Sequence, residues 1–168
     1  GSNLETISEV TLEDVSFAYV KDETVLRNIS LSVQAGETLA VVGPTGSGKT
    51  SLINLLVRFY DPTSGRVLVN GRDVKTLDAA TLRKKLALVM QDPFLFSETI
   101  KENIVQGSPN ISDEALDRII EYSKCRGLVD GLPDGIHTVL SEGGSSISSG
   151  ERQLLSIARA FARDPDLI

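Results

Sequence analysis

Residues 43–50 of this chain read Gly43-Pro44-Thr45-Gly46-Ser47-Gly48-Lys49-Thr50. This stretch follows the pattern G-x-x-x-x-G-K-[ST], in which glycines let the backbone curl until successive N–H groups face one point. A helix that begins directly after the loop adds the partial positive charge of its N-terminus at the same place. The stretch therefore predicts an anion-binding loop that holds the phosphates of a nucleotide.

The residues on either side of this loop support the same interpretation. Residues 38–42 form a short apolar run with two adjacent valines, which is typical of a buried parallel strand. Residues 51–59 carry apolar side chains at helical spacing, which predicts a helix. The order strand, glycine loop, helix predicts an α/β fold with a P-loop core built on a parallel sheet. In such a loop Lys49 reaches the β- and γ-phosphates, Thr50 holds Mg²⁺ and Ser51 contacts the α-phosphate.

The composition of the chain narrows its class. With 168 residues, of which 40% are hydrophobic, it is long enough for one domain with a hydrophobic core. The net charge of -6 argues against a nucleic-acid partner, because nucleic-acid-binding surfaces are usually basic. The single cysteine, Cys125, cannot form an internal disulfide, which favours a reducing compartment. No apolar run approaches the ~20 residues of a membrane helix, so we expect any membrane role to come from a partner or from another part of the polypeptide.

The first third of the chain has the alternation of β-strands. Val15, Phe17 and Tyr19 alternate with smaller side chains, and residues 25–33 continue in strand character. Asn70-Gly71, between two further short strands, is the favoured two-residue hairpin turn. These signals predict an N-terminal antiparallel β unit beside the parallel core, and residues 86–90 predict another buried strand of that core.

The second half of the chain has helical patterns. Ser112 is placed to cap a helix over residues 113–124, and a second helix is expected over residues 150–163. The glycine- and serine-rich stretch 141–151 leads directly into that second helix. A serine hydroxyl, a glycine and a helix N-terminus form a second anion-binding geometry, but a plain N-cap after a flexible loop gives the same pattern.

Three positions allow two interpretations from the residues alone. Tyr19 is either a half-buried strand tyrosine or a flat aromatic surface for a nucleobase. Gln91 follows a predicted strand, where ligands of α/β sheets bind, and its amide either reaches a metal or water or is a plain polar loop group. The apolar stretch 94–96 is expected in the core, with a docking surface for a partner helix as the alternative. His137 stands without neighbouring ligand-type residues, and we expect it to be structural or solvated.

Taken together, these motifs resemble the ATP-binding domain of ABC transporters over nearly the whole chain after the first ten residues. Tyr19 matches the aromatic residue that stacks on adenine, and residues 43–50 match the Walker A loop. Gln91 matches the glutamine that contacts Mg²⁺ and links the site to the membrane domain. Residues 147–151 stand where the family has its Leu-Ser-Gly-Gly-Gln signature. Residues 92–104 and 138–144 resemble exporters rather than importers.

The resemblance implies a mechanism and a set of site residues. In this family two ATP-binding domains pair head to tail, and each ATP lies between the Walker A loop of one and the signature of the other. The resemblance implies catalytic roles for Lys49 and Gln91 and Mg²⁺ contacts for Thr50 and Gln91. We expect the nucleotide to contact Tyr19, Val25, Gly43, Thr45, Gly46, Ser47, Gly48, Lys49, Thr50, Ser51, Ser148, Gly150 and Glu151.

Two departures from the family pattern matter. Ser149 replaces a glycine of the signature and Glu151 replaces its glutamine. An ionised Glu151 cannot donate a hydrogen bond and repels a γ-phosphate, so we expect a degenerate site and one half of a heterodimeric exporter. The family's Walker B aspartate and catalytic glutamate are expected beyond Ile168, where residues 166–168 resemble the start of another strand. This chain alone is therefore expected to bind ATP without hydrolysing it.

The sequence thus predicts one ATP-binding domain over residues 1–168, truncated within the Walker B strand. Residues 1–10 are interpreted as a tag remnant and linker, and residues 92–147 as the helical subdomain. The expected function is the ATPase subunit of an exporter, at the cytoplasmic face of a membrane, with a transmembrane domain as partner. The alternatives are a soluble ABC ATPase that does not act in transport and a nucleotide-gated interaction module that does not hydrolyse ATP.

Overall fold

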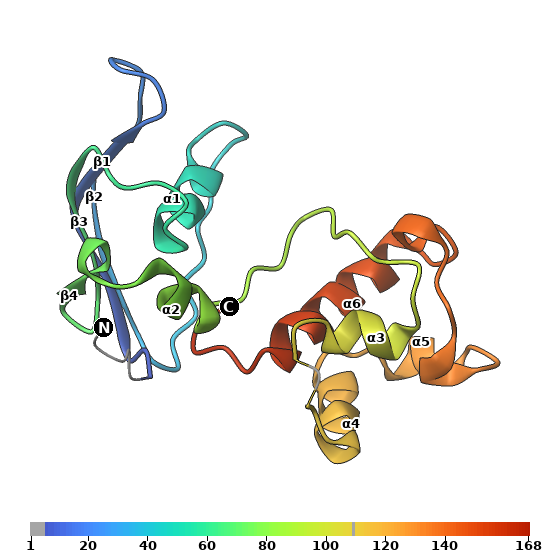
Figure 1. Ribbon diagram of the computed structural model, residues 1–168. Helices are drawn as coiled ribbons and strands as arrows, with labels where there is room; N and C mark the ends of the chain where they lie inside the picture. The colour runs from blue at the N-terminus through green and yellow to red at the C-terminus, as the bar shows by residue number, and fades with distance from the viewer. Residues whose placement is uncertain (1–5, 109) are drawn as a thin grey trace. The chain divides into compact units, whose positions relative to one another are not determined.

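A computed structural model describes residues 6–108 and 110–168 of the chain. It divides the chain into two compact units (Figure 1). The first unit contains the residues up to Leu86 together with Leu167, and the second contains Ala87–Asp166 together with Ile168. Gly1 and Ser2, interpreted above as part of a tag remnant, lie outside the described residues.

The first unit is built on a four-stranded antiparallel sheet in the order β2-β1-β3-β4. Its strands are β1 (Glu9–Ala18), β2 (Thr24–Gln34), β3 (Ser64–Val69) and β4 (Arg72–Asp73). Asn70 and Gly71 join β3 to β4 with φ values of 50° and 72°, which are the left-handed conformations that a two-residue hairpin turn requires. The predicted antiparallel β unit and its Asn-Gly turn are confirmed.

A β-bulge keeps the apolar side chains of β1 on one face. Leu12 pairs with Leu31 but Val15 pairs with Ile29, so β1 contains one extra residue at this point. Asp14 within the bulge has a φ of 46°. The insertion changes the alternation, so that Leu12 and then Val15 both point into the core.

Gly65 on β3 lies against this bulge. A Cβ on Gly65 would lie 2.4 Å from the carbonyl oxygens of both Glu13 and Asp14. No real Cβ approaches a backbone oxygen so closely, and the φ of Gly65 is also positive at 78°. The bulge and the glycine therefore depend on each other.

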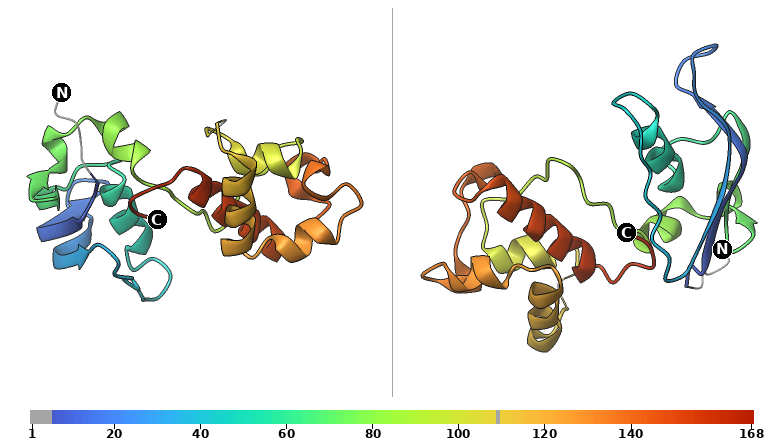
Figure 2. Two further views of the ribbon diagram at one scale, coloured as in Figure 1. Left: turned by 90° about the horizontal axis from the view of Figure 1, so that it is seen from below. Right: turned by 180° about the vertical axis from the view of Figure 1, so that it is seen from behind.

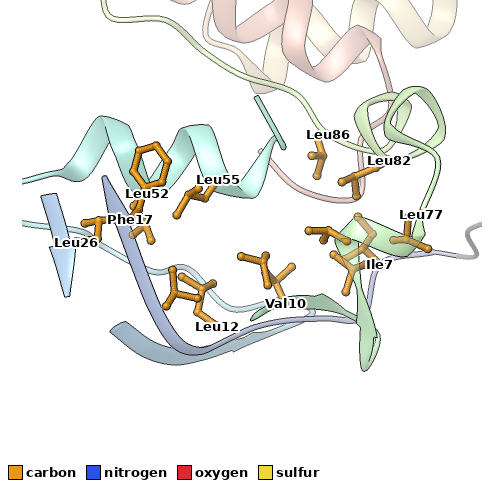
Figure 3. Close-up of a cluster of buried hydrophobic side chains, with 14 residues drawn as sticks. Ile7, Val10, Leu12, Phe17, Leu26, Leu52, Leu55, Leu77, Leu82 and Leu86 are labelled. Atoms are coloured by element: carbon orange, nitrogen blue, oxygen red, sulfur yellow. The ribbon is translucent and has the colours of Figure 1, made fainter. Parts of the chain in front are cut away.

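Two helices cover the inner face of this sheet. Helix α1 (Lys49–Leu56) and helix α2 (Ala79–Lys84), with the short 3₁₀ turn η1 (Val74–Thr76), contribute Leu55, Leu82 and Val74 to a core shared with the strands (Figure 3). Leu55 and Leu82 are completely buried. Burial of this kind stabilises by about 2 kcal/mol for each large side chain, so α1 is fixed on the sheet and presents its N-terminus at a defined place.

The second unit consists of helices and short turns. Its elements are α3 (Ile100–Val105), α4 (Asp113–Tyr122), α5 (Arg126–Asp130), η2 (Gly135–His137), η3 (Glu142–Gly144) and α6 (Ser149–Ala162). Helix α6 lies beside α3 (Figure 2), and its Leu155 and Ala158 are buried in one core with Ile100 and Ile104. The two predicted helices are confirmed as α4, capped by Ser112, and α6.

The lone cysteine and histidine lie in this second unit. Cys125 is completely buried, and burial raises the pKa of its thiol. It is therefore a small hydrophobic core residue. His137 ends the η2 turn and is exposed.

Two predicted core strands are not strands in the structure. Residues 38–42 are irregular and exposed, and residues 87–90 are also irregular. Only Leu86, at the start of the second segment, forms a parallel bridge, with Leu167. A parallel strand needs hydrogen-bonded neighbours along its length and helices on both faces, and within the described residues the segments 38–42 and 87–90 have no strand partners. The buried parallel sheet that the sequence predicts is therefore not formed by the described residues, which hold an antiparallel sheet and helices.

Candidate nucleotide-binding site

The loop over residues 43–50 has the backbone that the glycine pattern predicts. Gly46 and Gly48 have φ values of 82° and 95°, a conformation that residues with a Cβ rarely adopt. A Cβ on Gly48 would lie 2.7 Å from Leu26 Cδ2, and one on Gly43 would lie 2.6 Å from Ser47 Oγ. Gly48 is also the N-cap of α1, so the loop ends where free backbone N–H groups begin. These are the requirements of a phosphate-binding loop.

The side chain of Lys49 folds back over this loop. Its Nζ donates to the carbonyl oxygens of Gly43 at 2.7 Å and Pro44 at 2.9 Å, and to Ser47 Oγ at 3.4 Å. Thr45, Gly46 and Ser47 are exposed around it. The loop thus holds a positive charge above its exposed N–H groups, which suits a polyphosphate anion.

Thr50 and Ser51 occupy the first turn of α1. Thr50 is exposed, whereas Ser51 is only 5% exposed. No group of three or more His, Cys, Asp or Glu side chains within residues 6–108 and 110–168 is arranged to hold a metal ion. Mg²⁺ commonly binds through one or two protein oxygens, several waters and the phosphates of the substrate. The Thr50 hydroxyl fits that mode of binding, because it is open to solvent at the mouth of the loop.

Two predicted nucleotide contacts lie on strands of the same unit. Val25 is near the helix start, since a Cβ on Gly48 would lie 3.4 Å from Val25 Cγ1. Tyr19 directly follows β1 and is 47% exposed. Its hydroxyl accepts a hydrogen bond from Asn54 Nδ2 on α1 at 3.1 Å. The first unit therefore groups Tyr19, Val25 and the phosphate loop around one helix.

Sequence reasoning missed Asn54 and Tyr60 as neighbours of Tyr19. The Tyr60 and Tyr19 rings lie with centroids 5.1 Å apart and planes at 90°. Asn54 is the one polar residue in the apolar run 52–57, and this isolated polar side chain could have indicated a hydrogen-bonding role. The contact of Tyr60 joins positions far apart in the sequence, and no local pattern indicates it.

The second unit holds the signature residues at the N-terminus of α6. Ser148 is the N-cap, and its Oγ accepts a hydrogen bond from the backbone N–H of Glu151 at 3.2 Å. Glu151 Oε2 accepts one from the backbone N–H of Ser148 at 2.7 Å. This capping box lowers the pKa of Glu151, mainly through the backbone N–H of Ser148 and then through its hydroxyl. Glu151 is therefore ionised at neutral pH. Gly150 has open space, with only Ser148 Oγ 4.0 Å from an added Cβ.

Gln91 lies in an exposed irregular segment of the second unit. It does not end a strand, as the sequence predicted, because residues 87–90 remain unpaired within the described part of the chain. The site residues thus fall into two groups, one in each unit: Tyr19, Val25 and residues 43–51 in the first, and Gln91, Ser148, Gly150 and Glu151 in the second.

An apolar groove follows Gln91 within the second unit. It has a volume of about 300 Å³ and is lined by Met90, Pro93, Phe94, Phe96 and Arg159, among others. Phe94 is 61% exposed and Phe96 is 37% exposed, while Leu95 between them is completely buried. The prediction that stretch 94–96 lies in the core is therefore wrong for both phenylalanines, because alternate side chains of an extended segment point to opposite sides.

Arg159 of α6 holds this segment in place. Its guanidinium donates to the carbonyl oxygen of Phe94 at 3.0 Å, to that of Asn103 at 2.8 Å and to Asn103 Oδ1 at 3.0 Å. Asn103 is 1% exposed and in turn accepts from the backbone N–H of Phe96 at 2.9 Å. Burial lowers the pKa of Arg159. The signature helix and the segment after Gln91 are therefore connected by one hydrogen-bonded network.

Known proteins resemble this chain over almost its whole length. The family model described as "ABC transporter" matches residues 26–168. An ABC transporter ATP-binding protein of Bacillus subtilis, YfiC, is 45% identical over 95% of this chain and 26% of its own. A putative multidrug export ATP-binding/permease protein of the same organism, YgaD, is 45% identical over 95% of this chain and 28% of its own.

A solved structure agrees. The structure of a bacterial Atm1-family ABC exporter with ATP bound superimposes with a TM-score of 0.89 at 36% identity, over 96% of this chain and 28% of that one. The chain therefore spans about a quarter of the length of the relatives it matches. A family match over most of the chain and an arrangement of loop, helix and sheet shared with an exporter lead to one conclusion: this chain belongs to the ABC transporter family, as an exporter-type ATP-binding domain.

Proposed function

We propose that this chain binds Mg²⁺ and ATP in the first unit and forms the ATPase part of a membrane exporter, at the cytoplasmic face of the membrane. The observation that carries the proposal is the arrangement of residues 43–50, with Lys49 held over a glycine loop at the N-terminus of a fixed helix. The exporter relatives support the role in transport. Among the described residues, no helix has the length and apolar character needed to cross a bilayer. The transmembrane domain that we propose as partner is supported by the relative YgaD, which is named an export ATP-binding/permease protein.

Lys49 and the loop would hold the phosphates of ATP. When the triphosphate enters, Lys49 Nζ exchanges the carbonyl oxygens of Gly43 and Pro44 for phosphate oxygens, which are stronger acceptors. The N–H groups at the start of α1 complete the binding of the anion. Thr50 offers a hydroxyl to Mg²⁺, and the bound metal neutralises charge on the phosphates. Gln91 is proposed as the second protein contact of that metal.

ATP turnover is proposed to need a second ATP-binding domain. The N-terminus of α6, with Ser148 and Gly150, would meet the nucleotide held by the loop of that partner. Ser148 Oγ accepts a bond from Glu151 N–H, and the Ser148 hydroxyl also hydrogen-bonds the Glu151 carboxylate. This hydroxyl would have to release that carboxylate before donating its proton to a phosphate oxygen. The negative charge of the ionised Glu151 beside it repels that phosphate. We therefore propose a heterodimer in which the partner supplies the intact signature for the Lys49 site.

The two apolar segments that are exposed here have a place in this proposal. Leu39, Val42, Leu88 and Met90 are all more than 40% exposed, and Leu86 already forms a parallel bridge with Leu167. We propose that residues 38–42 and 86–90 pair as parallel strands in a core sheet completed by further residues of the transporter. Strong protection of their amides from hydrogen exchange in the assembled transporter is expected, and rapid exchange would contradict the pairing.

The test of the proposed function is nucleotide turnover in the assembled exporter. We expect Mg²⁺-dependent ATP hydrolysis that Lys49→Ala in this chain reduces at least tenfold, because the loop then loses its only charged phosphate contact. ATP binding without turnover would instead indicate a nucleotide-gated interaction module. Turnover in a complex that contains no membrane-spanning partner would indicate a soluble ABC ATPase.

A further inference from the structure

The ring of Tyr19 is held on several sides by residues to which no role has been assigned above. The centroid of Phe17 lies 4.7 Å from that of Tyr19 with the planes at 80°, and the centroid of Tyr60 lies 5.1 Å away with the planes at 90°. Phe17 also contacts Tyr60, at 5.6 Å between centroids. Three aromatic rings thus form one cluster, in which the near-perpendicular contacts are those that aromatic quadrupoles favour.

Asn54 fixes the far end of the Tyr19 ring. Its Nδ2 donates to the Tyr19 hydroxyl at 3.1 Å. A ring with neighbours at its sides and a hydrogen bond at its hydroxyl cannot rotate or tilt freely. The ring is nevertheless 47% exposed, so part of its surface stays open to a ligand. Such an arrangement orients an aromatic surface before a ligand arrives, which reduces the entropy lost on binding.

Asn54 connects this ring to the phosphate loop. It lies on α1, five residues after Lys49, which corresponds to about 7.5 Å along a helix axis. Because Asn54 and Lys49 lie on the same helix, the Tyr19 hydroxyl is held at a constant distance from the helix end that is proposed to bind phosphate. A nucleotide held at the loop would find the aromatic ring at a distance and angle that α1 itself determines.

We propose that Asn54 and Tyr60 are positioning residues that orient Tyr19 toward the base of the bound nucleotide. This inference rests on the proposed function, because it needs a nucleotide at the loop over residues 43–50. It goes further because it assigns part of the affinity for the nucleotide base to Asn54 and Tyr60, which belong to none of the family motifs of this chain. The same contacts in a purely structural role would stabilise the first unit without any preference for a ligand that carries a base.

The test compares a ligand that carries adenosine with one that consists of the phosphates alone. ATP and inorganic tripolyphosphate, each with Mg²⁺, are titrated into the full chain by calorimetry, and a ring-stacked base gives ATP the higher affinity. We expect Asn54→Ala to weaken ATP binding about three- to tenfold, the usual effect of one lost hydrogen bond. Tripolyphosphate binding is expected to stay within twofold of the parent chain. The matched control is Asn110→Ala, because Asn110 is an exposed asparagine of the second unit. It is expected to change neither the ATP affinity nor the tripolyphosphate affinity.

A double-mutant cycle identifies the hydrogen bond as the cause. Tyr19→Phe keeps the ring but removes the acceptor, so it is expected to reproduce the effect of Asn54→Ala, and the double variant is expected to be no weaker than either single one. Tyr60→Leu is expected to lower ATP affinity in the same selective way. Far-ultraviolet circular dichroism checks that each variant keeps the helices of the parent chain.

Three results would overturn the inference. These are an equal loss of ATP and tripolyphosphate affinity in Asn54→Ala, additive effects of Asn54→Ala and Tyr19→Phe, or equal affinities of the parent chain for the two ligands. Failure of the proposed function is distinguishable, because a parent chain that binds neither ligand, or a Lys49→Ala variant that binds both as the parent does, contradicts the phosphate site itself.

Discussion

Glu151 and Ser148 satisfy each other's backbone at the start of α6: the Glu151 carboxylate accepts from Ser148 N–H at 2.7 Å, and Ser148 Oγ accepts from Glu151 N–H at 3.2 Å. Glu151, one of the two residues that depart from the family signature, is therefore a helix-capping residue, and it places its negative charge on the helix end. Thr99 and Glu102 form the same arrangement at the start of α3, with Glu102 Oε2 accepting from Thr99 N–H at 2.8 Å.

These two capping boxes allow a matched experiment on the charge. Glu151→Gln keeps the cap, because glutamine serves the same position, but it removes the negative charge and adds a donor. In the proposed heterodimer we expect higher affinity for ATP at the site to which α6 is proposed to contribute, by about three- to tenfold. The measurement is nucleotide titration of the dimer, with Glu102→Gln as the control for a neutralised capping box. Equal effects of the two substitutions, or none from Glu151→Gln, would contradict a role of the charge.

The capping carboxylates also predict an acid dependence of stability. Hydrogen bonds from Ser148 lower the pKa of Glu151, and those from the side chain and backbone of Thr99 lower that of Glu102, below the ordinary value of 4.5. A lowered folded-state pKa gives stability that is present above the unfolded value and lost as the pH falls through the folded value. We therefore expect the melting temperature to decrease once the pH is lower than about 4.5. The melting temperature of the variant with both Glu102→Gln and Glu151→Gln is expected to decrease less over the same pH range. Identical pH profiles would contradict this.

Arg159 is expected to be important for the stability of the second unit. Arg159→Ala removes three hydrogen bonds and leaves the buried Oδ1 of Asn103 with one donor fewer, so we expect a loss of about 1–3 kcal/mol in the free energy of unfolding. The measurement is urea unfolding together with hydrogen exchange over residues 94–103. Arg163→Ala, an exposed arginine that lines the same groove, is the control and is expected to cost less than about 0.5 kcal/mol. Similar losses in the two variants would show that the network adds little.

The bulge in β1 predicts a clear difference between two glycines with positive φ. Gly65→Ala combines left-handed strain with a contact of 2.4 Å to backbone oxygens, and we expect a loss of about 3 kcal/mol or more. Gly71→Ala has the same kind of φ but open space around its Cβ, and we expect about 1 kcal/mol. Urea unfolding of both variants gives the comparison. A smaller loss for Gly65→Ala than for Gly71→Ala would contradict the described packing of the bulge.

Local signals predicted much of this fold. The alternation around Val15, the Asn-Gly turn and the Ser112 cap depend on neighbouring residues, and each element formed where its pattern placed it. The strands at 38–42 and 86–90 did not form, because a parallel strand depends on partners that are distant in sequence. The same reason hides the contact between Asn54 and Tyr19, which are 35 positions apart. The positive φ values of Gly46 and Gly48 could be predicted because the loop needs them whatever surrounds it, whereas the contact of Lys49 with phosphate stays a prediction.

Calorimetric titration of ATP and Mg²⁺ into the full chain and into its Lys49→Ala variant tests whether residues 43–50 form a nucleotide site. We expect saturable binding at one site per chain, weakened at least tenfold by the substitution, with tripolyphosphate competing for the same site. Binding that is equal in the two proteins, or that tripolyphosphate does not displace, would contradict a nucleotide site at these residues.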